Sequence, residues 1–162
     1  MIGFKDCLRL LWGLLALLSV STTSSAVVPV RCGAILPLTG PLSAVGLSIR
    51  RAVELALEKQ SQVDFIFEDD AFTPRQSVSA ATKLISVDKV QCLLTFGSTT
   101  SLAIGDLAER SKVPTISIAI SPKVSQGKRY VLKHYADPEV LAAAATHEIE
   151  RRGYQRIAVI TT

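Results

Sequence analysis

The chain has 162 residues, of which 48% are hydrophobic and 20% charged, and its formal net charge is +4. This composition is typical of a globular protein and excludes disordered, collagen-like and coiled-coil classes, while the length excludes a large multidomain enzyme. The basic residues form no single block. Their densest stretch, residues 123–133, lacks the interleaved aromatic residues of a nucleic-acid-binding surface, so we read it as a solvated loop and expect no nucleic-acid partner.

The first 26 residues have the three-part layout of a secretory signal peptide. Lys5 and Arg9 give a basic start, residues 10–20 are an apolar run, and Ser24-Ser25-Ala26 supplies small residues before a cleavage site predicted after Ala26. An uncleaved membrane anchor is the alternative, but the apolar run is shorter than the about 20 residues that a spanning helix needs. We therefore expect a signal peptide over residues 1–26 and an exported, soluble, periplasmic product.

After this segment, short apolar runs alternate with segments of helical periodicity. Strands are predicted at residues 30–36, 63–68, 91–96, 115–120 and 156–161, with a weaker extended segment at 131–135. Helices are predicted at residues 45–59, from Pro74 after a Thr73 cap, at 101–111, and from Pro138 after an Asp137 cap to Gly153. The alternation predicts an α/β fold, a parallel sheet with flanking helices.

Apolar stripes indicate which helix faces turn toward the sheet. In the first helix the stripe is Ile49, Ala52, Val53 and Ala56, and in the last it is Leu141, Ala144, Ala145 and Ile149. The strands are apolar on both faces, which is typical of parallel strands covered by helices on both sides.

Cys32 and Cys92 are the two cysteines left after removal of the signal peptide. An oxidising compartment permits a disulfide, and both residues lie near the starts of strands that we expect to be neighbours. A bond also requires the two side chains to point to the same face of the pleated sheet. We predict two buried free thiols, with a disulfide as the alternative.

His134 and His147 show no metal-ligand spacing, so we expect no metal and no cofactor.

The strand order 2-1-3-4 is one of two common arrangements, and it would place a ligand beyond the carboxyl ends of the first and third strands. After the third strand, Gly97 is followed by four hydroxyl residues at a helix N-terminus, where free N–H groups favour an anion. Simple helix capping is the alternative. After the fourth strand, residues 117–122 offer carbonyl and hydroxyl groups near the same crevice, with ordinary turn chemistry as the alternative.

Motifs of enzymes are absent from the sequence: it has no nucleophile elbow, phosphate-binding loop or dinucleotide fingerprint. The turn Glu68-Asp69-Asp70 could hold a metal ion or accept a phosphoryl group, but we prefer a solvated acidic turn. A secreted α/β hydrolase using Ser98 or Ser121 is a rival hypothesis. No His–acid pair near either serine is identified, which favours a binding protein without catalytic activity.

Residues 33–43, Gly-Ala-Ile-Leu-Pro-Leu-Thr-Gly-Pro-Leu-Ser, resemble the opening of type I periplasmic binding proteins, above all the branched-chain amino-acid ABC-transporter group. The resemblance continues in order through residues 50–56, 68–74, 98–100, 112–117 and 152–159. It implies a two-lobe protein that closes on an amino acid or similar small polar ligand and delivers it to an ABC permease in the membrane. A sensor ectodomain with the same fold is the alternative.

The same resemblance assigns roles to four residues. Ser98, through its hydroxyl, and Thr99, through its N–H, would hold the ligand's carboxylate. Ala119 would offer its carbonyl to the ammonium group, and Ser121 replaces a threonine that binds through its N–H and Oγ. Val45 stands where an aromatic residue often lines the pocket, so no narrow side-chain specificity is assigned.

The resemblance also divides the chain. Residues 27–133 would form an incomplete N-terminal lobe, and residues 134–162 the truncated start of a second lobe. Residues 156–161 would then be the first strand of that second lobe, rather than a strand docked beside the fourth strand of the first sheet. A chain that carries one wall of the cleft is expected to bind its ligand weakly or not at all.

Overall fold

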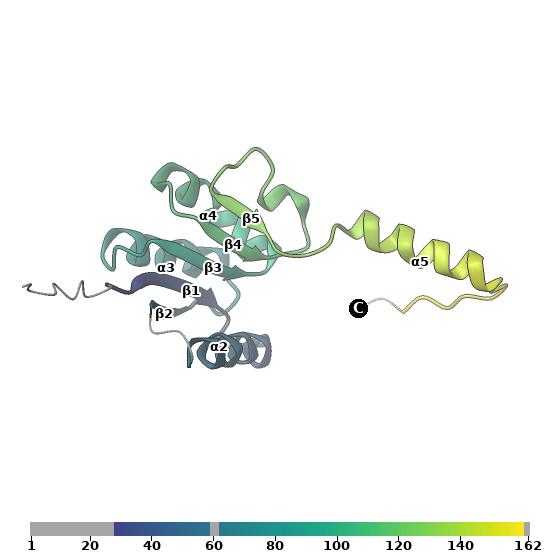
Figure 1. Cartoon of the computed structure of the whole chain (residues 1–162), viewed down its shortest axis with the longest axis horizontal. Coiled ribbons are helices and arrows are strands. Elements are labelled where there is room, and N and C mark those ends of the chain that lie inside the picture. Colours follow the sequence, from purple (N-terminus) through teal and green to yellow (C-terminus); the bar gives the residue numbers. More distant parts are fainter. Residues whose placement is uncertain (1–27, 59–61, 161–162) are drawn as a thin grey trace, which may run out of the picture.

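The computed structural model describes residues 28–58 and 62–160, so the predicted signal peptide and its cleavage site lie outside the described residues. Five parallel strands form one sheet in the order β2-β1-β3-β4-β5 (Figure 1). Their bounds are β1 Val30–Leu36, β2 Val63–Asp69, β3 Cys92–Phe96, β4 Thr115–Ile118 and β5 Val131–Lys133. The predicted α/β class is confirmed. The first four strands have the 2-1-3-4 order, one of the two common arrangements, and the weak extended segment forms the edge strand β5.

Four α-helices are described, α2 Ser43–Leu57, α3 Pro74–Ser86, α4 Ser98–Ser111 and α5 Pro138–Arg152, together with a 3₁₀ turn at Pro122–Val124. Helices α3 and α4 pack on one face of the sheet, where they enclose the main core. That core contains Ile35 of β1, Leu84 of α3, Leu93 of β3 and Ile104 of α4. All four side chains are buried, so this face is closed to water.

Helix α2 lies on the opposite face, over β1 and β2. The Arg50 guanidinium of α2 stands 5.0 Å from the centre of the Phe67 ring of β2. The helix approaches the end of β1 so closely that a Cβ at Gly46 would lie 2.0 Å from the Pro37 carbonyl oxygen. Only glycine fits there. Of the predicted stripe, Ile49 and Val53 are half-buried, whereas Ala52 and Ala56 are exposed.

Beyond α2, the same face of the sheet is uncovered over β4 and β5. Ile116 and Leu132 are register partners on these strands, and they are 48% and 62% exposed. On the other face Thr115, Ser117 and Val131 are buried. The expectation of burial on both faces is therefore wrong for β4, because no helix of the described chain covers its second face, and the edge strand β5 is open on the same side.

Cys32 and Cys92 form a disulfide, so the prediction of two free thiols is wrong. The two residues are direct register partners on the parallel strands β1 and β3, with their Cα atoms 4.6 Å apart. Register partners in a parallel pair point to the same face of the sheet, which meets the requirement that the sequence left open.

Thr73 and Asp137 occupy the N-cap positions of α3 and α5, as predicted, but neither side chain bonds to the N–H groups of its helix. Thr73 precedes Pro74 of α3, yet its Oγ1 donates a hydrogen bond to the Asp70 carbonyl at 3.1 Å. Asp137 precedes Pro138 of α5 and pairs with Lys133 Nζ at 2.8 Å. Neither side chain therefore caps its helix.

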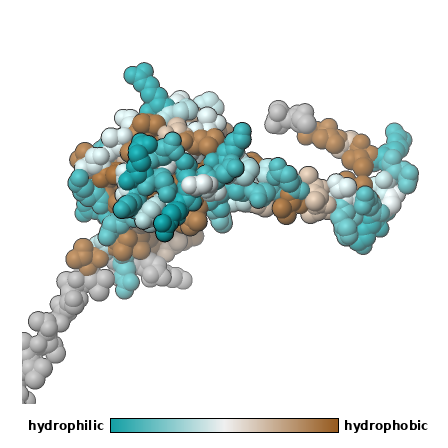
Figure 2. All heavy atoms as spheres, turned by 90° about the horizontal axis from the view of Figure 1, so that it is seen from above, coloured by the Kyte–Doolittle hydropathy of each residue, from teal (hydrophilic) through white to brown (hydrophobic). Residues whose placement is uncertain are grey.

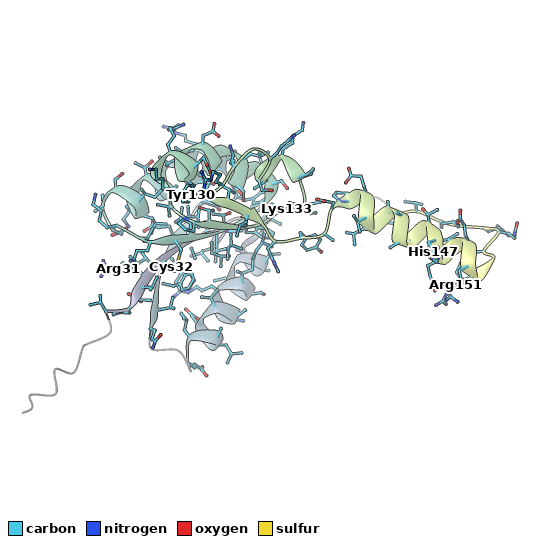
Figure 3. All side chains as sticks on the ribbon, turned by 45° about the horizontal axis from the view of Figure 1, so that its top comes forward. Arg31, Cys32, Tyr130, Lys133, His147 and Arg151 are labelled. Atoms are coloured by element: carbon cyan, nitrogen blue, oxygen red, sulfur yellow. A yellow bond between two sulfur atoms is a disulfide. The ribbon has the colours of Figure 1, made fainter. Side chains whose placement is uncertain are left out.

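Helix α5 extends away from the sheet, as Figures 1 and 3 show for the segment that carries His147 and Arg151. None of its residues is buried, so the predicted stripe of Leu141, Ala144, Ala145 and Ile149 does not reach a core. Gly153 ends the helix with φ +68°, as predicted.

The segment after α5 is extended but unpaired, and hydrophobic side chains are exposed along it (Figure 2). The strand predicted at residues 156–161 is therefore not formed over its described part, residues 156–160. A β-strand needs a hydrogen-bonded neighbour, and the described chain offers none there. In the described part of the chain, no helix has the length and apolar character to cross a membrane.

Candidate ligand-binding site

A pocket of about 310 Å³ lies at the carboxyl ends of the strands, where the sequence places the switch point. Its walls come from the loops after β1, β2, β3 and β4. The lining residues are Leu42, Phe72, Phe96, Gly97, Ser98, Thr99, Ile118, Ala119 and Ile120. Three of the four predicted site residues, Ser98, Thr99 and Ala119, thus meet in one pocket. Ser121 lies next to it and contacts Ser98.

Helix α4 begins inside this pocket with an uncapped N-terminus. Its N-cap is Gly97, whose φ of +91° is a conformation that favours glycine, and no side chain caps the helix. The Thr100 hydroxyl donates backward to the Gly97 carbonyl at 3.1 Å. Since the first N–H groups of a helix have no acceptor within it, they point outward and carry partial positive charge. Side-chain capping, the alternative for these hydroxyls, is not found.

Ser98 connects the two loops that the sequence singled out. Its Oγ accepts hydrogen bonds from the N–H groups of Ile120 at 3.2 Å and of Ser121 at 3.1 Å. A hydroxyl that accepts twice still has its own proton to donate. The Ser98 hydroxyl can therefore donate to a carboxylate. The Ser121 N–H, which the resemblance assigns to the ligand, is bonded to Ser98 in this structure.

Buried hydroxyl groups hold the strands and α4 in place beneath the pocket. Thr95 Oγ1 lies 2.9 Å from Ser101 Oγ and donates to Ser117 Oγ at 2.9 Å. The Gly97 N–H donates to the Ile118 carbonyl at 3.0 Å. Because buried polar groups that are fully paired specify one arrangement, this network fixes the start of α4 against the end of β4.

The rest of the pocket wall is apolar. Leu42, Phe72, Phe96, Ile118 and Ile120 supply it, and the described lining contains no charged residue and no histidine. None of these five side chains was predicted to contact a ligand, although Ile118 and Ile120 lie within the predicted loop at residues 117–122. Phe96 ends its strand directly before the other predicted loop, so its position also offered a signal. Phe72 had none, because its place depends on the conformation of the turn before α3.

The Glu68-Asp69-Asp70 turn is structural, which corrects the expectation of a solvated acidic turn. Asp69 Oδ1 accepts the N–H groups of Leu38 at 2.8 Å and Ala71 at 2.9 Å. Asp70 is fully buried and accepts the Phe72 N–H at 2.9 Å and the Ser77 hydroxyl at 2.8 Å. The two aspartates thus hold the backbone around the pocket.

The charge of Asp69 is stabilised by this environment. Burial alone would raise the pKa of Asp69, but hydrogen bonds from the Thr39 side chain and from the N–H groups of Ala71, Thr39 and Leu38 outweigh it. The pKa of Asp69 therefore lies below its ordinary value.

Comparison with known proteins shows a consistent set of relatives. Residues 29–162 match the family described as periplasmic binding protein. Leu/Ile/Val-binding protein homolog 3 of Brucella melitensis is 34% identical over 86 residues, which are 48% of this chain and 23% of that protein. Leu/Ile/Val-binding protein homolog 2 of Brucella abortus is 33% identical over 113 residues, or 64% and 30% of the two chains. The chain thus spans less than a third of the length of these curated relatives.

The solved structures that are similar to this chain are also those of solute-binding proteins. A leucine-binding protein of Thermotoga maritima is similar with a TM-score of 0.69 and 30% identity, over 76% of this chain and 38% of that one. A solute-binding protein of an ABC transporter from Rhodopseudomonas palustris, solved with 3,4-dihydroxybenzoic acid, has a TM-score of 0.60 and 28% identity over 64% and 31% of the chains. These relatives are solute-binding proteins. The family match, the parallel sheet and its neighbours together show that this chain belongs to the periplasmic binding protein family, type I, and corresponds to its N-terminal part.

Proposed function

We propose that the chain is the first lobe, with the start of the second, of an exported solute-binding protein that binds amino acids or similar small polar ligands for an ABC transporter. In this proposal residues 27–133 belong to the first lobe and residues 134–162 to the second, and the protein works in the periplasm with a membrane permease. The observation that carries the proposal is the uncapped start of α4, which opens into the pocket beside the Ser98 hydroxyl.

The ligand's carboxylate would lie on the donors of this helix end. The Thr99 N–H and the Ser98 hydroxyl would donate to it, and the partial positive charge of the helix N-terminus would add to their attraction. The Ala119 carbonyl and the Ser121 Oγ, from the loop after β4, would accept from the ammonium group. Since the described lining is uncharged, hydrogen bonds and the helix dipole would meet the ligand's charges on this wall of the cleft.

The same geometry disfavours the hydrolase hypothesis. A nucleophilic serine donates its proton to a base held within hydrogen-bond reach. Ser98 Oγ instead accepts two backbone N–H groups, and the described residues that line the pocket include neither histidine nor carboxylate. In the proposal the site would bind and orient a carboxylate without activating a nucleophile against it.

Amide chemical shifts of the ¹⁵N-labelled chain test the proposal, because they report binding at millimolar ligand. L-leucine, chosen from the names of the relatives, should shift the amide signals of Ser98 and Thr99. Isoamylamine has the same side chain without a carboxylate and should leave them in place. Ser98→Ala should weaken leucine binding at least tenfold, since a hydrogen bond to a charged group contributes about 1.5–3 kcal/mol.

A matched variant separates the site from general effects on folding. Ser48 is an exposed serine of α2 whose Oγ donates to the Ala44 carbonyl at 2.7 Å. Ser48→Ala removes the same hydroxyl away from the pocket and should bind leucine like the wild type. Equal shifts with isoamylamine and leucine, or equal affinity of the wild type and Ser98→Ala, would contradict the proposed site.

A further inference from the structure

Phe72 reaches the pocket through an unusual turn between β2 and α3. Ala71 and Phe72 both have positive φ, +44° and +59°, in the left-handed region that non-glycine residues seldom adopt. The turn is held by the aspartates before it: Asp69 accepts the Ala71 N–H and the buried Asp70 accepts the Phe72 N–H, each at 2.9 Å. Such backbone conformations persist where the surroundings fix them. Here their effect is to aim one aromatic ring.

The ring of Phe72 lies directly over Gly97 at the start of α4. A Cβ at Gly97 would be 2.4 Å from Cε2 of Phe72 and 3.1 Å from its Cζ. Gly97 is thus required twice, once for its φ of +91° and once because the Phe72 ring occupies the space of a side chain. The ring and the donors of the anion site therefore share one wall of the pocket.

A second ring completes this wall. The ring centroids of Phe72 and Phe96 are 6.0 Å apart, with the planes tilted by 45°, and both residues line the pocket. Resting on the proposed function, we propose that Phe72 is a specificity-determining residue, which with Phe96 selects carboxylates that carry an aromatic side group. The carboxylate on the α4 donors would direct this group onto the two rings.

The preference for an aromatic group over an aliphatic one follows from ring geometry. Tilted and offset rings at 4.5–7 Å attract each other beyond the burial of apolar area, by about 0.5–1.5 kcal/mol for each pair. A third ring supplied by the ligand gains this attraction, whereas a saturated ring of the same size gains burial alone. One such contact corresponds to an affinity ratio of about 2- to 13-fold.

Benzoate and cyclohexanecarboxylate test the proposal because they differ in aromaticity and hardly in size or charge. In the full wild-type chain, both should shift the Ser98 and Thr99 amides, and benzoate should bind about 2- to 13-fold more tightly. Phe72→Leu keeps an apolar side chain and removes one of the two rings, so this ratio should fall. Phe65→Leu is the matched control, because Phe65 stacks on Phe67 in β2, outside the pocket lining. It should keep the ratio.

Equal binding of the two ligands by the wild type would overturn the proposal without any variant, and so would a ratio that Phe72→Leu leaves unchanged in a folded chain. If neither carboxylate shifts the Ser98 and Thr99 amides, the proposed anion site itself fails. Shifts at these amides without a preference for benzoate would instead leave the anion site standing and overturn the role of Phe72.

Discussion

Asp69 shows how a single side chain organises the residues around the pocket. Its carboxylate joins the end of β2 to the loop after β1 through Leu38 and Thr39, and it fixes the turn that carries Phe72 through Ala71. Each of these bonds is strongest when the carboxylate is ionised, because charge-assisted hydrogen bonds are stronger than neutral ones. The ionisation of Asp69 is therefore linked to the stability of the fold.

Stability should fall in acid partly through Asp69. Its pKa is lower in the folded chain than the ordinary value of 3.8, so folding gains stability above that value and loses it as the pH falls through the folded pKa. Asp69→Asn should be less stable than the wild type at pH 7, and the difference should shrink as the pH drops below about 3.9. Urea unfolding between pH 7 and pH 2.5 measures this.

Asp64 provides the control for this prediction, since it is an exposed aspartate on the same strand. Asp64→Asn should follow the wild-type curve throughout. A constant gap between the wild type and Asp69→Asn across the whole pH range would contradict the linkage, because it would show that the charge of Asp69 has no part in the loss.

The residues that sequence could locate are those whose role follows from position along a strand or helix. Ser98, Thr99 and Ala119 follow strand ends, and strand ends of a parallel sheet meet at one edge, so their presence in one pocket was predictable. Phe72 was not, because its direction depends on two consecutive left-handed residues, whose N–H groups donate hydrogen bonds to two aspartates. Such a turn has no residue pattern of its own.

At the scale of elements, the disulfide joins strands β1 and β3, which are 60 residues apart in sequence. The bond between Cys32 and Cys92 depends on the register of β3 against β1, and the apolar pattern of the two strands does not determine that register. A shift by one residue would have turned the Cys92 side chain to the other face of the sheet. In contrast, the bounds of β1 followed from the sequence, and strand–helix alternation with right-handed crossovers restricted the strand order to two common arrangements, one of which is observed.

Reduction of this disulfide should destabilise the chain by about 2–4 kcal/mol, because the open chain regains the entropy of a long loop. Urea unfolding with and without reductant measures the change, and the Cys32→Ala, Cys92→Ala double variant should not respond to reductant. In denaturant without reductant, only Cys7 of the uncleaved chain should react with a thiol reagent. Reaction of Cys32 and Cys92 as well would show that the bond is not formed.

At the scale of the whole molecule, the described chain divides into a packed sheet with three helices and a separate segment. Helix α5 was correctly located by its cap position, proline and final glycine, yet its apolar stripe has no partner. Local residues such as a cap and a proline predict that a helix forms. Burial of its apolar stripe requires a neighbouring element, and the stripe does not identify that element. The second lobe that we propose from residue 134 onward would provide such neighbours.

Truncation after Asp137 tests this division. The shortened chain keeps both the bond from the His134 N–H to the Ser117 carbonyl at 2.7 Å and the Asp137 partner of Lys133, so β5 keeps its end. Because α5 buries no residue, removing residues 138–162 should change neither the urea midpoint nor the m-value, which follows the area exposed on unfolding. In the full chain, the α5 amides should exchange quickly with solvent while those of β3 are protected, since an isolated helix of 15 residues is marginal in water. A lower midpoint after truncation, or protected α5 amides, would mean that α5 packs on the sheet and that residues 134–162 belong to the first lobe.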